Sequence, residues 1–275
     1  MTTHLTEQPQ KTRLKWVDIG INLTNRRYAK DRQQVIDRAQ KNGVDKLIIT
    51  GTSVSESEQA LALAQSRPGI LFATAGCHPH DAKSLDNEGM AKLERLAKQP
   101  AVVAIGECGL DFNRNFSPPT KQIEAFEKQL ELAIALQKPL FLHERDAFDT
   151  QFSILKQYRE QIGDAVIHCF TSDKHKLAKY LDLNLYIGVT GWICDERRGQ
   201  DLYQAVAFIP DDRLMLETDG PYLTPRNLSP KPTDNRNEPQ YLPHIAQTVA
   251  NARNQSLQHL SDISYTNSCR FFNLS

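Results

Sequence analysis

The sequence lacks the features that mark secreted, membrane-spanning and disulfide-stabilised proteins. Its five cysteines form no Cys-x-x-Cys pair, which favours a reducing compartment over a disulfide framework. Every apolar run falls short of the roughly 18 residues that a membrane-spanning helix needs. The first fifteen residues contain no apolar signal core. We therefore expect a cytoplasmic protein that makes no membrane contact.

An excess of charge of either sign is also absent. The 33 Lys and Arg residues balance the 33 Asp and Glu residues, and the isoelectric point is near 7.1. No net field draws the whole protein onto a polyanion or an anionic membrane. A nucleic-acid ligand would therefore have to be held by a local cluster of cations.

What the sequence does contain is an alternation of short apolar runs with amphipathic, helix-like stretches. This pattern is typical of βα units around a parallel sheet, and 275 residues is close to the usual size of one (β/α)8 TIM barrel. We expect an α/β fold with a single TIM-barrel domain over residues 16–275, preceded by a flexible extension over residues 1–15. The expected strands are at about 16–23, 46–51, 71–80, 102–107, 139–143, 165–168, 185–191 and 214–219.

Four potential metal ligands each stand at the C-terminal end of a separate apolar run. Glu107 ends VVAIGE, His143 ends PLFLH, His168 ends AVIH and Asp219 ends LMLETD. The runs are continuously apolar, as buried parallel strands are. Because a barrel gathers the C-terminal ends of its strands at one rim, where such enzymes place their catalytic groups, these four side chains should converge.

Two imidazoles and two carboxylates form a ligand set with a definite chemistry. The set suits zinc, manganese or, with added waters, magnesium, and it lacks the thiolates of a closed structural zinc site. One or two divalent ions there could activate a water and polarise a phosphoryl or carbonyl oxygen, with Asp219 as ligand or general base. Each residue alone could be a hydrogen-bonded rim histidine or a helix cap, but four such placements favour a shared site.

Longer motifs extend these strand ends: AGCHPHD (75–81), AIGECGLDFNRNFSPP (104–119), FLHERDA (141–147), HCFTS (168–172), YIGVTGWICDERRG (186–199) and ETDGPYLTPR (217–226). From about Trp16 onward the chain closely resembles the TatD family of metal-dependent deoxyribonucleases in the amidohydrolase superfamily, nearest to the subgroup of TatD proper. The resemblance implies metal ligands at Glu107, His143, His168 and Asp219, with Glu107 and Asp219 catalytic. It also implies a cytoplasmic, magnesium-dependent 3′-5′ exonuclease that acts on single-stranded DNA or RNA and is linked to DNA repair.

The first strand departs from the family pattern. Most relatives carry a His-x-His pair after an Asp, whereas this chain reads DIGINL and has Gly20 and Asn22 at the two histidine positions. Glycine offers no ligand atom, and the neutral amide oxygen of Asn22 suits magnesium better than zinc. We therefore expect at most a weak metal or substrate contact from Asn22, and a preference for magnesium over manganese or zinc.

Substrate contacts are expected from the same rim loops. His78 and His80 could contact substrate or metal, although one of them could be structural beside the rigid Pro79. Basic side chains could hold several phosphates, and aromatic side chains could stack on bases. The basic candidates are Arg26, Arg27, Arg114, Arg145, Arg197, Arg198, Arg226, Lys231 and Arg236, and the aromatic candidates are Phe112, Phe116, Phe170, Trp192 and Tyr222.

Two other function classes remain open. The same fold and metal set also serve acyl chemistry, so a hydrolase of a small amide, lactone or aminoacyl ester is the main alternative. Such an enzyme would show an enclosed pocket where a nuclease shows an open basic groove. The third class is a non-catalytic binder that has lost its metal, and the intact set of four ligands argues against it. The neutral charge predicts a monomer with no obligate protein partner.

Overall fold

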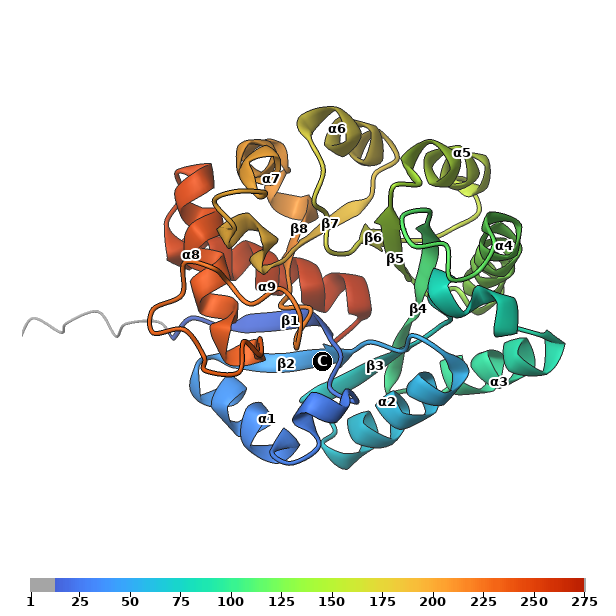
Figure 1. Cartoon of the computed structure of the whole chain (residues 1–275), viewed down its shortest axis with the longest axis horizontal. Coiled ribbons are helices and arrows are strands. Elements are labelled where there is room, and N and C mark those ends of the chain that lie inside the picture. Colours follow the sequence, from blue (N-terminus) through green and yellow to red (C-terminus); the bar gives the residue numbers. More distant parts are fainter. Residues whose placement is uncertain (1–12, 275) are drawn as a thin grey trace, which may run out of the picture.

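The computed structural model describes residues 13–274, and these residues form one eight-stranded parallel sheet wound into a barrel (Figure 1). Each strand pairs with the next one along the chain, from the first to the last. The predicted TIM barrel is confirmed. The strands are β1 (Trp16–Ile21), β2 (Val44–Ile49), β3 (Leu71–Ala75), β4 (Val102–Asp111), β5 (Leu140–Arg145), β6 (Ala165–Ile167), β7 (Tyr186–Val189) and β8 (Leu214–Leu216).

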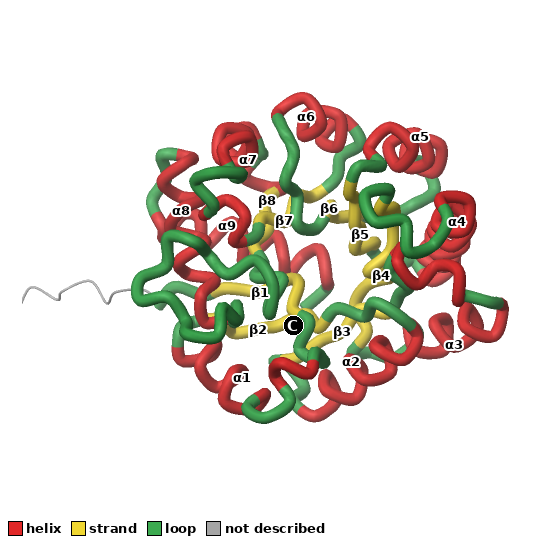
Figure 2. Tube along the Cα trace, in the orientation of Figure 1, coloured by secondary structure: helices red, strands yellow, loops and turns green. Residues whose placement is uncertain are grey.

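Helices surround the strands on the outside of the ring (Figure 2). Several begin at residues that the sequence marks as caps, since Ser53, Asp86 and Asp173 each accept a backbone N–H from the first helical turn. The helices are α1 (Arg32–Lys41), α2 (Val54–Ser66), α3 (Asn87–Ala97), α4 (Pro119–Leu136), α5 (Phe148–Tyr158), α6 (Lys174–Asp182), α7 (Gln200–Ala205), α8 (Leu242–Arg253) and α9 (Leu257–Phe272). Within residues 13–274, no helix is long and apolar enough to cross a membrane.

Two strand ends differ from those expected by more than three residues, and both lie beside the site. The expected strand over 71–80 ends at Ala75, because Pro79 opens a short 3-10 helix, Pro79–Ser84. The expected strand over 102–107 continues to Asp111, so Glu107 lies inside β4 rather than at its end. The short helix α7 was not expected from the sequence.

The barrel closes between β8 and β1 through a short seam. Ile21 and Gly220 form a parallel bridge, and the backbone N–H groups of Asn22 and Asp219 donate to the carbonyls of Gly220 and Gly20, each at 2.8 Å. The seam therefore places Asn22 next to Asp219, although the two residues are far apart in the sequence.

The inside of the barrel is apolar toward its N-terminal end. Val17, Ile48 and Phe141 belong to one buried cluster that also contains Phe271 and Phe272 at the end of α9. Side chains from the C-terminal helix thus close the base of the barrel. The interior can open only toward the rim formed by the C-terminal ends of the strands, which is where the candidate ligands lie.

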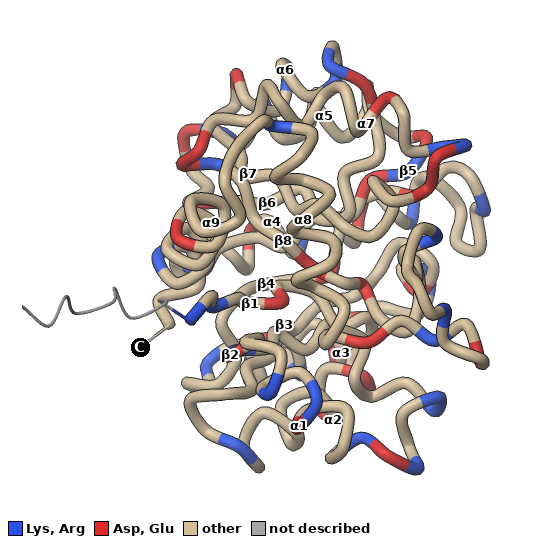
Figure 3. The backbone as a smooth tube through the Cα atoms, turned by 90° about the vertical axis from the view of Figure 1, so that its left-hand side faces the viewer, with Lys and Arg blue, Asp and Glu red and all other residues tan. Residues whose placement is uncertain are grey.

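The expected N-terminal extension lies mostly outside the described residues, which begin at Arg13. Its last part lies against the barrel: the Lys15 backbone N–H donates to the Ser261 hydroxyl at 3.0 Å, and that hydroxyl donates to the Lys15 carbonyl at 2.8 Å. Elsewhere, basic and acidic residues are interspersed over the backbone rather than gathered on one face (Figure 3). A basic surface for nucleic acid must therefore be local, as the neutral composition predicts.

Candidate metal centre

The carboxylate of Glu107 lies among three imidazole rings at the rim. Its Oε1 is 2.8 Å from His168 Nε2, 2.9 Å from His143 Nδ1 and 3.4 Å from His78 Nε2. These residues come from β4, the end of β6, β5 and the segment after β3, so neighbouring strands contribute to one cluster. Three nitrogen donors around one anionic oxygen form a geometry that a divalent cation can share.

Glycine backbone lets these strands approach closely enough to build the cluster. Gly106 has φ of 139°, a conformation that side chains disfavour. A Cβ on Gly106 would lie 2.2 Å from the Phe141 carbonyl oxygen, and a Cβ on Gly76 would lie 2.4 Å from the Gly106 carbonyl carbon. The β4 register is irregular between Ile105 and Cys108, at the point where Glu107 joins the cluster.

The donor set fits a divalent ion. Ligand atoms of His78, Glu107 and His143 lie within 4.8 Å of one another. His143 Nε2 is buried and makes no hydrogen bond within the described chain, although it faces Asp111 Oδ2 at 3.4 Å. A buried nitrogen whose acceptor lies at that distance is open to a closer partner. Imidazole and carboxylate donors without thiolate match an open catalytic site rather than a closed structural one.

Protonation also prepares the cluster for a cation. Burial lowers the pKa of His78 to about 3, which keeps that ring neutral with a lone pair available. Burial opposes ionisation of Glu107, but His168 and His78 outweigh it and hold the Glu107 pKa well below its usual value. Burial likewise opposes a charge on His168, but Glu107 and Glu217 raise its pKa well above the usual value. A bound ion would take over the role of that imidazolium proton, so metal binding should release protons.

Glu217 was not predicted as a site residue from the sequence. It lies beside Nδ1 of His168, the ring nitrogen that does not face Glu107. It is fully buried; its Oε2 lies 3.4 Å from His168 Nδ1, and its Oε1 accepts the backbone N–H of Cys169 at 2.5 Å. A carboxylate beside one imidazole nitrogen directs the other nitrogen toward the metal position. The only sequence signal was its place in ETDGP, where it reads as the end of an apolar strand.

The carboxylate of Glu217 lies close to the backbone of Gly20 and Gly188. A Cβ on Gly20 would lie 2.3 Å from Glu217 Oε2, and a Cβ on Gly188 would lie 2.6 Å from Glu217 Oε1. The carboxylate fills the space that a side chain at position 20 would need.

Asp219 lies beside the cluster without a direct contact to it. Its Oδ1 accepts a hydrogen bond from the Asn22 amide nitrogen at 3.0 Å, so Asn22 as placed presents an N–H donor to Asp219 rather than an oxygen to a metal. Burial is the main cause that raises the Asp219 pKa to about 8, with His168 opposing the rise and Glu107 and Glu217 adding to it. Asp219 therefore lies close enough to His168 and Glu107 to interact with them electrostatically.

His80 lies one step back from the cluster. Its Nε2 is 2.8 Å from Asp111 Oδ2, the same oxygen that faces His143, and its ring meets Phe116 edge-on with centroids 4.7 Å apart. Asp111 Oδ1 accepts the backbone N–H groups of Asn113 and Arg114. Asp111, which sequence reasoning also missed, thus joins His80, His143 and the loop that follows β4.

Comparison with known proteins identifies the family. Residues 17–273 match the model of the TatD related DNases. The chain belongs to the TatD family. It is 51% identical to a 3′-5′ ssDNA/RNA exonuclease TatD from Erwinia tasmaniensis over 94% of this chain and 99% of the relative. It is 50% identical to an exonuclease of the same name from Edwardsiella piscicida, with the same coverage.

Solved TatD structures share the fold. YJJV, a TatD homologue from Escherichia coli K12, superposes with a TM-score of 0.86 at 25% identity, covering 94% of this chain and 98% of the other. A TatD family hydrolase from Entamoeba histolytica gives 0.84 at 26% identity, with 95% and 99% covered. The predicted family and its class of DNase-related hydrolases are confirmed.

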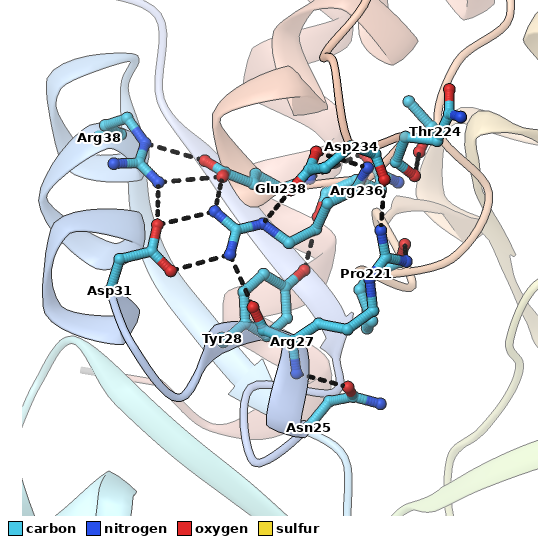
Figure 4. A network of polar contacts seen from close by, with 12 residues as sticks. Asn25, Arg27, Tyr28, Asp31, Arg38, Pro221, Thr224, Asp234, Arg236 and Glu238 are labelled. Atoms are coloured by element: carbon cyan, nitrogen blue, oxygen red, sulfur yellow. Dashed lines mark hydrogen bonds and ion pairs between the residues drawn. The ribbon is translucent and has the colours of Figure 1, made fainter.

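Among the rim cations of this TatD family member, Arg236 is not a free substrate contact. Only 12% of its side chain is exposed, and it pairs with Asp31 and Glu238 at 2.7 Å and 2.6 Å. Figure 4 shows these pairs together with Arg38, which also contacts both carboxylates. The expectation that Arg236 contacts substrate is wrong, because its guanidinium is paired with the carboxylates of Asp31, at the N-cap of α1, and of Glu238, before α8.

Arg27 and Tyr28 contact the segment between β8 and α8, which also contains Arg236 and Glu238. Arg27 donates to the carbonyls of Pro221 and Asp234 at 3.1 Å and 2.8 Å, and the Tyr28 hydroxyl donates to the Asn237 carbonyl at 2.5 Å (Figure 4). These contacts fix the segment after β8 that carries Asp219. Phe170 is only 3% exposed, so the expectation that it stacks on bases is wrong as well.

Several other predicted substrate residues are exposed. Arg145 is exposed at the end of β5, and the Arg114 guanidinium lies 6.0 Å from the exposed Phe116 ring. Tyr222 is 52% exposed. Arg197, Arg198 and Arg226 all meet at Asp195, an arrangement that the sequence did not predict.

Proposed function

We propose that this chain is a divalent-metal-dependent 3′-5′ exonuclease that hydrolyses single-stranded DNA or RNA. The observation that carries the proposal is Glu107, whose single oxygen lies within 3.4 Å of three imidazole nitrogens at the rim of a TatD family barrel. Relatives named for that activity align at about half identity over nearly the whole chain. The relatives favour phosphodiester hydrolysis over hydrolysis of a small amide, lactone or aminoacyl ester.

We assign Glu107, His143 and His168 as metal ligands, with His78 as a further ligand and Asp219 at the edge of the site. A bound divalent ion would polarise the phosphoryl group and acidify an attacking water. The absence of imidazoles at Gly20 and Asn22 favours magnesium, with manganese and zinc as alternatives and one or two ions.

The residues of the chain supply orientation and proton transfer. Glu217 sets the direction of the His168 ring, and Asp111 supports His143 and His80. Asn22 occupies Oδ1 of Asp219, while Oδ2 makes no hydrogen bond among the described residues. We assign this Oδ2 as the acceptor for the proton of the attacking water.

Substrate would be held by the exposed cations and rings at the same rim. Arg114, Arg145, Arg197, Arg198 and Arg226 are assigned to backbone phosphates, because charge-assisted contacts to phosphate dominate affinity for nucleic acid. Phe116, Trp192 and Tyr222 are assigned to base stacking. A link to DNA repair, a cytoplasmic location and a monomeric state stay predictions from the sequence.

The test is hydrolysis of one single strand labelled at its 3′ end or at its 5′ end. Chelator-stripped protein receives magnesium, manganese or zinc, and Asp219→Ala is compared with Asp212→Ala, a control at the opposite end of β8. We expect early release of the 3′ label, a descending ladder from the 5′ label, dependence on metal, and loss only in Asp219→Ala. Absence of cleavage with every metal, on DNA and on RNA, would contradict the proposal.

A further inference from the structure

Asp195 is a buried carboxylate that gathers three arginines. Its side chain is 4% exposed, whereas those of Arg197, Arg198 and Arg226 are 57%, 58% and 38% exposed. Oδ1 accepts the Arg197 backbone N–H at 3.0 Å and lies 3.6 Å from Arg226 Nε, and Oδ2 accepts from Arg198 Nε at 3.0 Å. One carboxylate therefore holds one edge of several guanidinium groups.

The outward-facing nitrogens of these guanidinium groups have few hydrogen bonds or ion pairs within the described chain. In the described part of the chain, the Nη atoms of Arg198 make no hydrogen bond or ion pair, and Arg197 uses only Nε and Nη2, both toward Asp195. The remaining contact is a 3.6 Å pair between Arg226 Nη2 and the exposed Glu196. Guanidinium donors that are oriented but unpaired are suited to phosphate oxygens.

A ring lies beneath the cluster. The Arg198 guanidinium lies over the Trp192 ring at 4.4 Å, and a cation on an aromatic face is attracted by it. The Trp192 indole N–H is buried and has no hydrogen-bond partner among residues 13–274. The Trp192 ring therefore supports the Arg198 guanidinium from one side, and Asp195 holds it through Nε.

Two rim loops build the cluster together. Asp195, Arg197 and Arg198 follow β7, and Arg226 follows β8. The loops touch at Gly191, where a Cβ would lie 2.3 Å from the Leu223 carbonyl oxygen. Both loops follow C-terminal strand ends, so the cluster lies on the rim that carries Glu107. No hydrogen bond or ion pair between described residues joins it to the metal cluster.

We propose that Asp195 is the positioning residue of a phosphate clamp formed by Arg197, Arg198 and Arg226, and that this clamp binds backbone phosphates of a single strand outside the metal centre. The inference rests on the proposed function and deepens it. It makes binding depend on strand length, because only a strand that extends beyond the metal centre would contact the clamp.

The substitution Asp195→Asn tests the clamp, because the clamp and simple electrostatics predict opposite changes in binding affinity. Asp195→Asn removes a negative charge, and simple electrostatics then predicts tighter binding of a polyanion. The clamp predicts the opposite, because the arginines lose their common anchor. Glu196→Gln is the matched control, since it removes the same charge from the next residue, which is exposed. Arg198→Ala should reduce the salt dependence of binding by about one phosphate contact, a slope change of ~0.7.

Binding of a long fluorescent single strand is measured in chelator by anisotropy, and hydrolysis of the long strand and of a dinucleotide is measured with metal. For Asp195→Asn we expect at least five-fold weaker binding and a matching rise in KM for the long strand, with kcat and dinucleotide hydrolysis unchanged. Glu196→Gln should bind as tightly as the unaltered protein or more tightly.

Equal or tighter binding by Asp195→Asn would overturn the clamp. Equal losses on the dinucleotide and the long strand would overturn it too, because they would show a general disturbance of the site. If the unaltered protein hydrolyses neither substrate with any metal, the proposed function fails. The binding measurements in chelator still decide the clamp, so the two failures are distinguishable.

Discussion

At its base the barrel is closed by Phe271, Phe272 and Leu274, whereas at its rim Glu107 and Glu217 are buried among imidazoles. Apolar burial at the base stabilises the fold by about 1.5–3 kcal/mol for each large side chain. Buried carboxylates at the rim cost stability unless they are paired. The apolar base therefore stabilises the fold. The buried charged groups at the rim reduce that stability and are arranged to bind a cation.

The largest expected effect is at the rim. Glu107→Gln keeps the shape of the side chain but removes the anion around which the imidazoles gather. We expect hydrolysis to fall about 1,000-fold or more, equal to ~4 kcal/mol of barrier, because the cluster loses the anion that a cation needs. Activity and urea unfolding are measured beside Glu131→Gln, an exposed control on α4. Retained activity in Glu107→Gln would remove the distinction between rim and base.

The next largest effect is at the base, with the opposite pattern. Phe272 is 2% exposed, and Phe272→Ala should lower the unfolding free energy by about 3–5 kcal/mol because it leaves a cavity. Activity per folded molecule should be unchanged. Urea unfolding and active-site-normalised kinetics check this, and a fall in kcat without a fall in stability would speak against the comparison.

Glu217→Gln should have a smaller effect than Glu107→Gln or Phe272→Ala, and it should act on metal affinity. Removing the charge behind His168 should weaken manganese binding by roughly 10- to 100-fold, as measured by calorimetry on chelator-stripped protein. Glu131→Gln again serves as the control. Unchanged affinity would show that Glu217 only fills the space between Gly20 and Gly188.

The last expected effect is a dependence of stability on pH at Asp18 in β1, which accepts hydrogen bonds from the backbone N–H and the hydroxyl of Thr218 after β8. Burial is the main cause that raises the pKa of Asp18 to about 7, although Thr218 donates to it. The unfolded group ionises near its ordinary value of 3.8. The folded state thus holds the extra proton, and the Asp18 contribution to stability is full below pH 4 and is lost as pH rises toward 7.

Asp18→Asn removes this titration. The difference in unfolding free energy between the variant and the unaltered protein should shift in favour of the variant by up to about 1.4 kcal/mol per pH unit in that window. Chemical unfolding at a series of pH values measures it. A difference that does not vary with pH would show that Asp18 titrates normally.

The sequence predicted the barrel because the strand period and helix period alternate clearly, and it predicted a convergence at the rim because parallel strands share one direction. Glu107, His143 and His168 do meet there. Glu217 and Asp111 were missed because an acid at the end of an apolar run looks the same whether it supports a histidine or caps a helix.

The rim arginines show the limit of local reasoning more directly. Arg236 and Arg198 look alike in the sequence, as cations on loops after strands. Arg236 is consumed by Asp31, which lies some two hundred residues earlier in the chain, whereas Arg198 meets a carboxylate three residues before it and stays 58% exposed. Which arginines remain available is therefore a property of the tertiary contacts.

The measurement that tests the central claim most directly is anomalous diffraction at the manganese edge from crystals of this protein soaked with manganese. We predict a peak among Glu107 Oε1, His143 and His168, with His78 at its edge, and loss of that peak in Glu107→Gln. A peak at another place in the barrel, or no peak in crystals that hold the unaltered protein, would contradict the assignment of the rim as a metal centre.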